Sequence, residues 1–388
     1  MMEAAPGFEP GDKGFAVLCL TTWLCRRNEY SFPSPSPLSS HSGESIMASS
    51  AVLLENRGER NLRRDRLPRI VFVTGAAGFI GSHLCEALLA RGDRVFGFDN
   101  FDPFYDRRIK ERNLANLSAH PSFSFLDGDI RDASTLARWG EGMPADALVH
   151  LAAKAGVRPS VADPVGYADV NVLGTIRVLD WARERRVPKL LFASSSSVYG
   201  GNTKVPFAED DFVDRPVSPY AATKKAGELL CHTYCHLYGM NVVALRFFTV
   251  YGPRQRPEMA IHKFTRRILE GEGIDLYGDG SSRRDYTYID DIVSGILGAM
   301  GAPPGYRVYN LGESATISLS DLVALIEKAC GKAAVRRFRP PQPGDVPVTC
   351  ADISRARNEI GYDPRTPIGR GIFRFVEWYR CEVTIRPT

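Results

Sequence analysis

The chain lacks the cysteine framework that holds small secreted domains together. Its 388 residues include eight cysteines, and none of them forms a Cys-x-x-Cys pair. A chain of this length can bury a sizeable core without cross-links, and unpaired cysteines are typical of reducing compartments. We therefore expect free thiols, no disulfide and a cytoplasmic protein.

Long apolar runs are also missing. The stretch from Phe15 to Cys25 is apolar, but a helix needs about 20 such residues to cross a bilayer. The acidic residues Glu3, Glu9 and Asp12 precede it and no small-residue cleavage site follows, which argues against a secretion signal. We expect no membrane partner.

Neither sign of charge is in large excess, because 49 basic residues oppose 45 acidic ones and the net charge is +4. A nucleic-acid-binding surface requires a larger basic excess, so we expect no nucleic acid partner. Acidic small molecules stay open as partners. Arg336, Arg337 and Arg339 could receive phosphates, although a solvated surface is the favoured interpretation.

The pattern of metal ligands is incomplete as well. His232 and His236 lie four apart within the predicted helix 219–238, which is the separation of a helical metal pair. The acidic residue that completes a zinc protease motif is missing. We expect no metal.

The residues before the first predicted strand have no apolar period. The run SFPSPSPLSSHSGES is rich in serine and proline, which is typical of a segment that cannot form a packed core. We expect residues 1–68 to be a disordered extension, and we hypothesise that Met47 is the natural start. Mass spectrometry of the native N-terminus tests this hypothesis, and an intact Met1 peptide would contradict it.

From Arg69 onward, short apolar segments alternate with longer amphipathic ones. Strands are predicted at RIVFVT, RVFGFD, FSFLDGD, DALVHLAA, KLLFASSS and NVVALRFF. Strands that are apolar throughout belong to a parallel sheet covered by helices on both faces. The pattern predicts an α/β fold with a doubly wound parallel sheet over residues 69–250. Residues 251–388 are expected to form a smaller α/β substrate-binding lobe, with some segments returning to the first domain.

A glycine-rich turn follows the first strand. Gly75, Gly78 and Gly81 have a GxxGxxG spacing, one residue longer than the common dinucleotide fingerprint, and a helical segment follows. Glycine lets the backbone approach a pyrophosphate, whose charge meets free N–H groups at the start of the helix. Asp99 ends the second strand, where a carboxylate can bond ribose hydroxyls and would repel a 2′-phosphate. The pattern predicts NAD rather than NADP, and a turn that binds nothing is the alternative.

Two polar patterns later in the chain predict catalysis. Tyr220 and Lys224 lie four apart in a predicted helix and so project from one face. Free tyrosine, with a pKa of about 10, is a weak base at neutral pH, but an ammonium and an oxidised nicotinamide nearby favour the phenolate. The hydroxyl run Ser194 to Ser197 follows a strand, at the edge where α/β sheets bind ligands. Either pattern alone is common on protein surfaces, but their order after the glycine turn predicts a base and a hydroxyl that orients a sugar.

The segments TGAAGFIGSH, HLAAKAG, FASSSSVYG, YAATKKAGE and RFFTVYGP occur in the order and spacing of extended short-chain dehydrogenases. This family holds nucleotide-sugar epimerases, dehydratases and decarboxylases, and the resemblance covers about Arg69 to Tyr379. It implies a Rossmann domain with tightly held NAD, Tyr220 as base, Lys224 on the nicotinamide ribose and Ser195 as hydroxyl partner. The cofactor-binding residues that it implies are Gly75, Gly78, Phe79, Ile80, Gly81, Asp99, Asn100, Asp129, Ile130, Leu151, Ala152, Ala153, Lys154, Asn171, Tyr220 and Lys224.

Within that family the chain most resembles UDP-glucuronate 4-epimerases, through RFFTVYGP, RPEMA, RRDYTYIDDIV and PGDV. Glucose-type 4-epimerases usually carry Asn at Thr249, and decarboxylases usually carry Glu at Ser197, so both positions favour a hexuronate epimerase. Lys154 departs from the usual Gln, which leaves one cofactor contact open. The resemblance places neutral hydroxyls around the sugar carboxylate, from Ser195, Ser196, Ser197 and Thr249. It places charged side chains on the diphosphate and uridine, from Arg256, Arg284 and Asp345.

The resemblance thus implies 4-epimerisation of a UDP-sugar, from UDP-glucuronate to UDP-galacturonate, through a transient 4-keto sugar. Tyr220 would take the C4 hydroxyl proton while NAD accepts the hydride and later returns it to the opposite face. We hypothesise that neutral hydroxyls around the carboxylate, Thr249 among them, suppress loss of CO2 from the keto acid. A UDP-glucuronate decarboxylase, a UDP-glucose 4-epimerase and a nucleotide-sensing protein stay open as alternatives. Family members commonly dimerise through two helices, here residues 165–186 and 219–238, so we expect a homodimer.

Overall fold

The computed structural model describes residues 67–341 and 346–381. The proposed start at Met47, Asp345 and all but the last two residues of the predicted extension 1–68 therefore lie outside the described residues.

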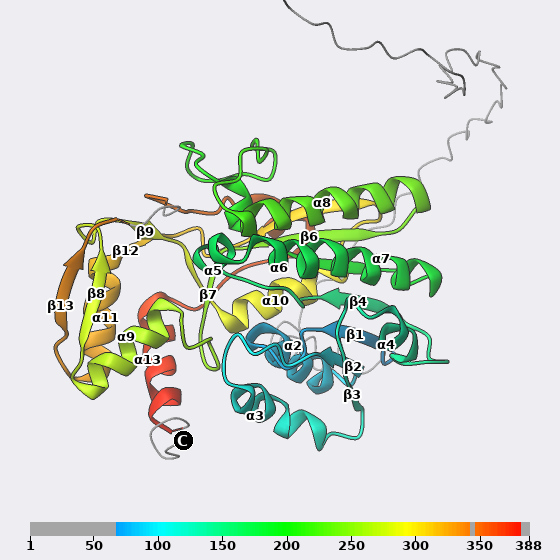
Figure 1. Cartoon of the computed structure of the whole chain (residues 1–388), viewed down its shortest axis with the longest axis horizontal. Coiled ribbons are helices and arrows are strands. Elements are labelled where there is room, and N and C mark those ends of the chain that lie inside the picture. Colours follow the sequence, from blue (N-terminus) through cyan, green and yellow to red (C-terminus); the bar gives the residue numbers. More distant parts are fainter. Residues whose placement is uncertain (1–66, 342–345, 382–388) are drawn as a thin grey trace, which may run out of the picture. The chain divides into compact units, whose positions relative to one another are not determined.

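A sheet of seven parallel strands forms the centre of the fold, in the order β11-β6-β5-β4-β1-β2-β3 (Figure 1). Six of these strands are the six predicted from the sequence, and β11 was not predicted. The strands are β1 (Ile70–Thr74), β2 (Arg94–Asp99), β3 (Phe123–Asp127), β4 (Ala147–His150), β5 (Leu190–Ser195), β6 (Val242–Phe247) and β11 (Tyr306–Leu311).

Both faces of the sheet are buried because side chains along a strand alternate between them. In β1, Val71 and Val73 belong to one hydrophobic cluster, whereas Phe72 belongs to a second cluster on the opposite face. All three side chains are fully buried. This arrangement confirms the predicted α/β fold with a doubly wound parallel sheet.

Helices cover the sheet on each side. They are α2 (Phe79–Ala90), α3 (Arg107–Ser118), α4 (Ala133–Arg138), α5 (Val157–Ala162), α6 (Pro164–Ala168), the π-helical η1 (Asp169–Leu173), α7 (Gly174–Glu184), the 3-10 turn η2 (Ser196–Tyr199), α8 (Pro219–Tyr238), α10 (Ile289–Ala299) and α12 (Ser354–Ile360). The α2 and α10 helices pack together on one face, and α7 packs against α8 on the other (Figure 1).

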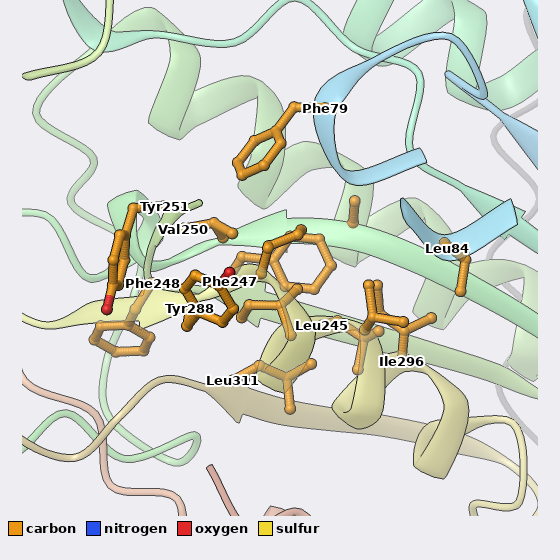
Figure 2. Close-up of a cluster of buried hydrophobic side chains, with 14 of the residues drawn as sticks. Phe79, Leu84, Leu245, Phe247, Phe248, Val250, Tyr251, Tyr288, Ile296 and Leu311 are labelled. Carbon is orange, nitrogen blue, oxygen red and sulfur yellow. The ribbon is translucent and has the colours of Figure 1, made fainter. Parts of the chain in front are cut away.

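One buried cluster joins early and late parts of the chain. Figure 2 shows Phe79 and Leu84 of α2 in the same cluster as Leu245 of β6, Ile296 of α10 and Leu311 of β11. Burial of such side chains is the main favourable term in folding. The helix that begins at the glycine turn is therefore held in place by residues far later in the chain, of which Ile296 and Leu311 lie more than two hundred positions away.

The remaining elements form a smaller group at one end of the sheet (Figure 1). Its main sheet pairs β8 with β13, and α11 packs against both α9 and α13. The elements are β7 (Thr249–Tyr251), α9 (Ala260–Glu270), β8 (Gly273–Tyr277), β9 (Arg283–Arg284), β10 (Tyr286–Tyr288), β12 (Ile317–Ser318), α11 (Leu319–Cys330), β13 (Val335–Arg339) and α13 (Ile368–Tyr379).

Three features of the described residues concern membranes, metals and thiols. No helix within residues 67–341 and 346–381 is long and apolar enough to cross a membrane. In the same ranges no three His, Cys, Asp or Glu side chains are grouped to hold a metal ion. The described cysteines, all of them free, are Cys85, Cys231, Cys235, Cys330, Cys350 and Cys381.

Candidate active site

A cavity of about 390 Å³ opens at the carboxyl ends of the central strands. Gly75 follows β1, Asp99 ends β2, Leu151 follows β4, Ser195 ends β5 and Phe247 ends β6, and all five residues line the cavity. In open α/β sheets this edge is where ligands bind, because loops that leave neighbouring strands part there. The topology therefore gathers residues from five strands around one volume.

The glycine turn brings backbone against backbone at the floor of the cavity. Gly75 has a φ of 73°, and a side chain at Gly81 would place its Cβ 2.0 Å from the Gly75 carbonyl oxygen. Gly78 caps α2, and Phe79, Ile80 and Gly81 of its first turn line the cavity. Free N–H groups at a helix start bind anions. Glycine at these positions therefore lets the turn close tightly and bring the free N–H groups of α2 to the cavity, where a phosphate could bind.

Asp99 is held in a buried network at the next strand end. Its carboxylate accepts hydrogen bonds from the N–H groups of Ala77 at 3.2 Å and Phe101 at 2.9 Å, and from Lys110 Nζ at 3.1 Å. Asp99 and Lys110 are 6% and 7% exposed. Because a carboxylate has about four lone pairs, Asp99 retains acceptor capacity for a ribose hydroxyl, and Lys110 can donate to the same diol.

The three predicted cofactor residues near β2 and β3 do not all line the cavity. Asn100 and Ile130 line the cavity, and Asp129 is not among the lining residues. Asn100 Nδ2 donates to Asp129 Oδ2 at 2.9 Å, and the hydrogen bonds from Arg131 hold the pKa of Asp129 at about 2. Asp129 therefore acts on this end of the cavity through Asn100.

The segment after β4 forms one side of the cavity. Leu151, Ala152, Ala153 and Lys154 all line it. Lys154 Nζ donates to Asp163 Oδ2 at 3.0 Å, so the amine that replaces the usual Gln is paired. Asn171 does not line the cavity, but its side chain bonds Lys154 N at 2.8 Å and Lys154 O at 2.9 Å. Asn171 thus positions this segment from the π-helical turn η1, a feature often found near functional sites.

Tyr220 lies in the first turn of α8. Ser218 caps the helix by accepting a hydrogen bond from Ala221 N at 3.1 Å, and Pro219 occupies the first turn, where its missing N–H costs nothing. The Tyr220 N–H donates to Ser160 Oγ at 3.0 Å. These contacts fix the start of α8 so that Tyr220 and Lys224, one turn later, line the same cavity.

The electrostatics of this pair depend on a third residue. Burial raises the pKa of Tyr220, whereas its hydrogen bond with Ser195 and the charge of Arg256 lower it. Burial lowers the pKa of Lys224 to about 8, and its Nζ donates to the Ala193 carbonyl at 2.8 Å. The pKa of Tyr220 is raised overall, and Arg256 is a cation that opposes this rise. Lys224 Nζ lies 6.0 Å from the centre of the Tyr220 ring.

The four consecutive serines divide into two roles. Ser194 Oγ donates to Glu228 Oε1 at 2.6 Å, and Glu228 is in turn paired with Arg246 at 2.8 Å. All four serines line the cavity, but the Ser194 hydroxyl is taken up by Glu228, whereas Ser195 Oγ lies 3.1 Å from Ser197 Oγ. Ser194 therefore ties β5 to α8, and the three that follow offer hydroxyls to a ligand.

The predicted sugar and nucleotide contacts are only partly brought together. Thr249 and Arg256 line the cavity. Arg284 does not; its guanidinium donates to the carbonyls of Arg283 at 2.9 Å and Pro347 at 3.3 Å. Asp345 lies outside the described residues.

Sequence reasoning missed several residues of the cavity wall. Lys110, Phe104, Tyr105 and Met259 line it, and the Arg256 guanidinium lies 5.8 Å from the centre of the Phe104 ring. Lys110 could have been found from its position on the apolar face of α3. A buried ammonium is unstable without a partner, so a lysine there indicates a carboxylate nearby. Phe104 and Tyr105 follow the strand that ends at Asp99, but nothing in their local sequence predicts that they reach the cavity.

Comparisons with known proteins agree with this site. Residues 71–312 match the model of the NAD dependent epimerase/dehydratase family. UDP-glucuronate 4-epimerase 2 of Arabidopsis thaliana is 46% identical over 327 residues, which cover 80% of this chain and 75% of that protein.

Solved structures of 4-epimerases also match this chain. UDP-glucuronic acid 4-epimerase from Bacillus cereus, in complex with UDP-glucuronic acid and NAD, has 37% identity and a TM-score of 0.75, covering 80% of this chain and 99% of its own. UDP-glucose 4-epimerase from Thermotoga maritima, solved with UDP-glucose, is 31% identical with a TM-score of 0.75. The match covers 82% of this chain and 100% of the Thermotoga chain. These matches confirm the resemblance drawn from the motifs.

Proposed function

Because this chain belongs to the NAD-dependent epimerase/dehydratase family, we propose that it is a UDP-glucuronate 4-epimerase that forms UDP-galacturonate with NAD as its cofactor. One observation carries the proposal: a single cavity is lined by the glycine turn, by Tyr220 and Lys224, and by Thr249 and Ser197. The last two positions carry the residues that favour a hexuronate. The relatives named above support the choice of sugar.

The residues present fit NAD. The absence of a side chain at Gly81 lets the start of α2 pack directly against the Gly75 carbonyl, so that the free N–H groups of the first turn face the cavity that a dinucleotide would occupy. The buried Asp99–Lys110 pair can accept from and donate to the adenosine ribose, and Ile130 offers an apolar wall. Bound here, NAD supplies reversible two-electron oxidation of a carbon that carries a hydroxyl.

The protein's own part in the reaction is proton transfer and orientation. Tyr220 takes the proton of the sugar C4 hydroxyl and returns it to the C4 oxygen when the keto sugar is reduced, and Ser195 shares its hydrogen bond. Lys224, whose Nζ donates to the Ala193 carbonyl, would donate to the nicotinamide ribose. Arg256 contributes the positive charge that favours the phenolate.

We propose that Ser196, Ser197 and Thr249 surround the sugar carboxylate with neutral hydroxyls. Arg256 is the proposed contact to the diphosphate, with Arg284 and Asp345 as further proposed contacts to the nucleotide. Arg284 is outside the lining of the cavity, so its role would require the sugar nucleotide to extend beyond it.

Product analysis tests the proposal. Purified protein is incubated in parallel with UDP-glucuronate and with UDP-glucose, without added NAD, and the sugars are resolved after hydrolysis. UDP-galacturonate in equilibrium with UDP-glucuronate is expected. UDP-xylose as the main product would indicate a decarboxylase, turnover of UDP-glucose alone would indicate a UDP-glucose 4-epimerase, and binding without turnover would indicate a sensing protein.

We also propose a homodimer formed through the segment from α6 to α7, which includes η1, and through α8. The support is a set of large apolar side chains that are between 48% and 78% exposed: Val165, Leu173, Leu229, Leu237 and Tyr238. Apolar patches of this kind mark association surfaces. Light scattering should give a dimer mass, and Leu229→Glu with Leu237→Glu should give a monomer; a wild-type monomer would contradict the proposal.

Two further proposals concern organisation. We propose that residues 69–250 bind NAD and that residues 251–388 mainly bind substrate, with β11 returning to the central sheet beside β6. A cytoplasmic location is proposed from the free thiols at the described cysteines.

A further inference from the structure

The loop that follows β7 has an unusual backbone. Arg254 has a φ of 64°, in the left-handed region that side chains with a Cβ rarely adopt. Such a conformation persists only where surrounding contacts hold it, and it is often found at functional sites. The contacts of Arg254 therefore need an explanation.

Those contacts go to α2, the helix that begins at the glycine turn. Arg254 Nη2 lies 2.7 Å from Glu86 Oε1, and Arg254 Nη1 donates to Ser82 Oγ at 3.3 Å. On the same helix, His83 Nε2 lies 3.0 Å from the Pro253 carbonyl oxygen, so Nε2 carries the proton that is donated. Burial and the charge of Arg254 lower the pKa of His83 to about 4, so the ring is neutral at physiological pH.

Two residues further along, Arg256 lines the cavity. Gln255 between them is buried, and its Nε2 donates to the Val250 carbonyl at 3.0 Å. The Arg256 guanidinium contacts Glu258 Oε1 at 3.1 Å and Met259 Sδ at 3.6 Å on its own loop, and its Nη1 donates to the Ala155 carbonyl at 3.5 Å. The loop thus contacts the cofactor domain at α2 through Pro253 and Arg254, and Arg256 meets the same domain at the cavity through its longer contact with Ala155.

We propose that Arg254 is a positioning residue: its ion pair with Glu86 ties the loop that carries Arg256 to α2, and so sets Arg256 against the diphosphate of the UDP-sugar. The inference rests on the proposed function, which makes Arg256 a nucleotide contact. It gives α2 two roles, since its first turn lines the cofactor side and its second turn anchors the nucleotide loop. Neither Arg254 nor Glu86 lines the cavity, so both act through Arg256.

The test measures UDP affinity by titration calorimetry and KM for UDP-glucuronate in the full chain. Arg254→Gly removes the side chain but keeps a residue that adopts a φ of 64° readily. We expect Arg254→Gly and Glu86→Gln each to weaken UDP binding by about 10-fold, Arg254→Lys to weaken it less, and the exchange Glu86→Arg with Arg254→Glu to restore part of it.

A matched control exists elsewhere in the chain. Arg336 and Glu327 form an ion pair of the same length, 2.7 Å, away from the cavity lining. Glu327→Gln should lower stability as much as Glu86→Gln does and leave UDP affinity unchanged. An equal loss of UDP affinity in both variants would overturn the inference, because the effect would then be one of general stability.

The decisive arm is a double-mutant cycle with Arg256→Ala. If Arg254 acts through Arg256, then Arg254→Gly should weaken UDP binding by less than twofold in the Arg256→Ala background. A full additional 10-fold loss in that background would overturn the inference. Wild-type protein that binds UDP, and loses affinity in the expected pattern, but forms no UDP-galacturonate would contradict the proposed reaction and leave this inference standing.

Discussion

The two walls of the cavity are built in different ways. On the cofactor wall, backbone groups set the geometry: Gly81 lies against the Gly75 carbonyl, and two main-chain N–H groups hold the Asp99 carboxylate. On the sugar wall, side chains on loops set it, as where Arg256 is held by Glu258 and Met259. Changes on the first wall should therefore act through steric collision and be severe, and changes on the second should be graded.

The largest effect is expected on the cofactor wall, from Gly81→Ala. The new Cβ would lie 2.0 Å from the Gly75 carbonyl oxygen, so the turn must shift. We expect purified variant without bound NAD and without measurable activity, by absorbance of the released cofactor and by product analysis. Gly369→Ala in α13 is the control, because its Cβ would meet only Leu325 at 4.0 Å. Full NAD content in the Gly81 variant would break the comparison.

A smaller but still large effect is expected where the two walls meet. Tyr220→Phe removes the hydroxyl that exchanges the substrate proton, and kcat should fall by roughly 100- to 10,000-fold. NAD content should not change, because the backbone of the cofactor wall is untouched. Tyr234→Phe on the same helix, whose hydroxyl bonds Asp180, should retain wild-type kcat. Loss of NAD together with kcat would mean that the two walls are not separable.

On the sugar wall we expect a graded effect from Thr249→Ala. Loss of one hydrogen bond to a carboxylate should lower kcat/KM by about 10-fold. The fraction of UDP-xylose among the products should rise, because a less restrained carboxylate is lost more readily from the keto acid. Thr233→Ala on the exposed side of α8 is the control. A product ratio that stays at the wild-type value would contradict the role given to Thr249.

The smallest effect is expected at Glu313, outside both walls. Burial, with Asp291 and Asp285 nearby, raises the pKa of Glu313 from 4.5 to about 7, and its Oε2 is buried without a hydrogen-bond partner in the described structure. A carboxyl whose pKa is raised on folding costs stability as pH rises from about 4.5 to about 7. Glu313→Gln should therefore raise Tm by a few degrees at pH 8 and by less at pH 5.

Exposed Glu111, paired with Arg107 on the surface, provides the control for this measurement. Glu111→Gln should give a pH-independent change of less than a degree or two, as surface pairs contribute little. A Glu313→Gln variant whose Tm falls at pH 8 would mean that the carboxylate makes a stabilising contact in solution.

The sequence predicted the cofactor wall better than it predicted the contacts between distant segments. Gly75, Gly81, Asp99, Tyr220 and Lys224, all predicted site residues, line one cavity, since the position of each depends on a strand end or a helix turn a few residues away. Such local relations repeat along the chain as motifs. They carry enough information to predict the parallel sheet and the cofactor side of the site.

Long-range placement could not be predicted in this way. The strand β11 joins the sheet beside β6, about sixty positions earlier, and its sequence YRVYNL has polar residues that hide the pattern of a buried strand. The Lys110 side chain extends from α3 to the Asp99 carboxylate at the end of β2. Arg284 donates to the carbonyls of Arg283 and Pro347 and does not line the cavity. Each outcome depends on packing between segments, which spacing within a motif does not report.

The central claim is that the hydrogen removed from C4 of the sugar is returned to the same carbon within the same protein molecule. UDP-glucuronate labelled with deuterium at C4, incubated with the purified protein in ordinary water without added NAD, tests it most directly. The account predicts UDP-galacturonate that retains the deuterium at C4. UDP-galacturonate that has exchanged the label with solvent would contradict it.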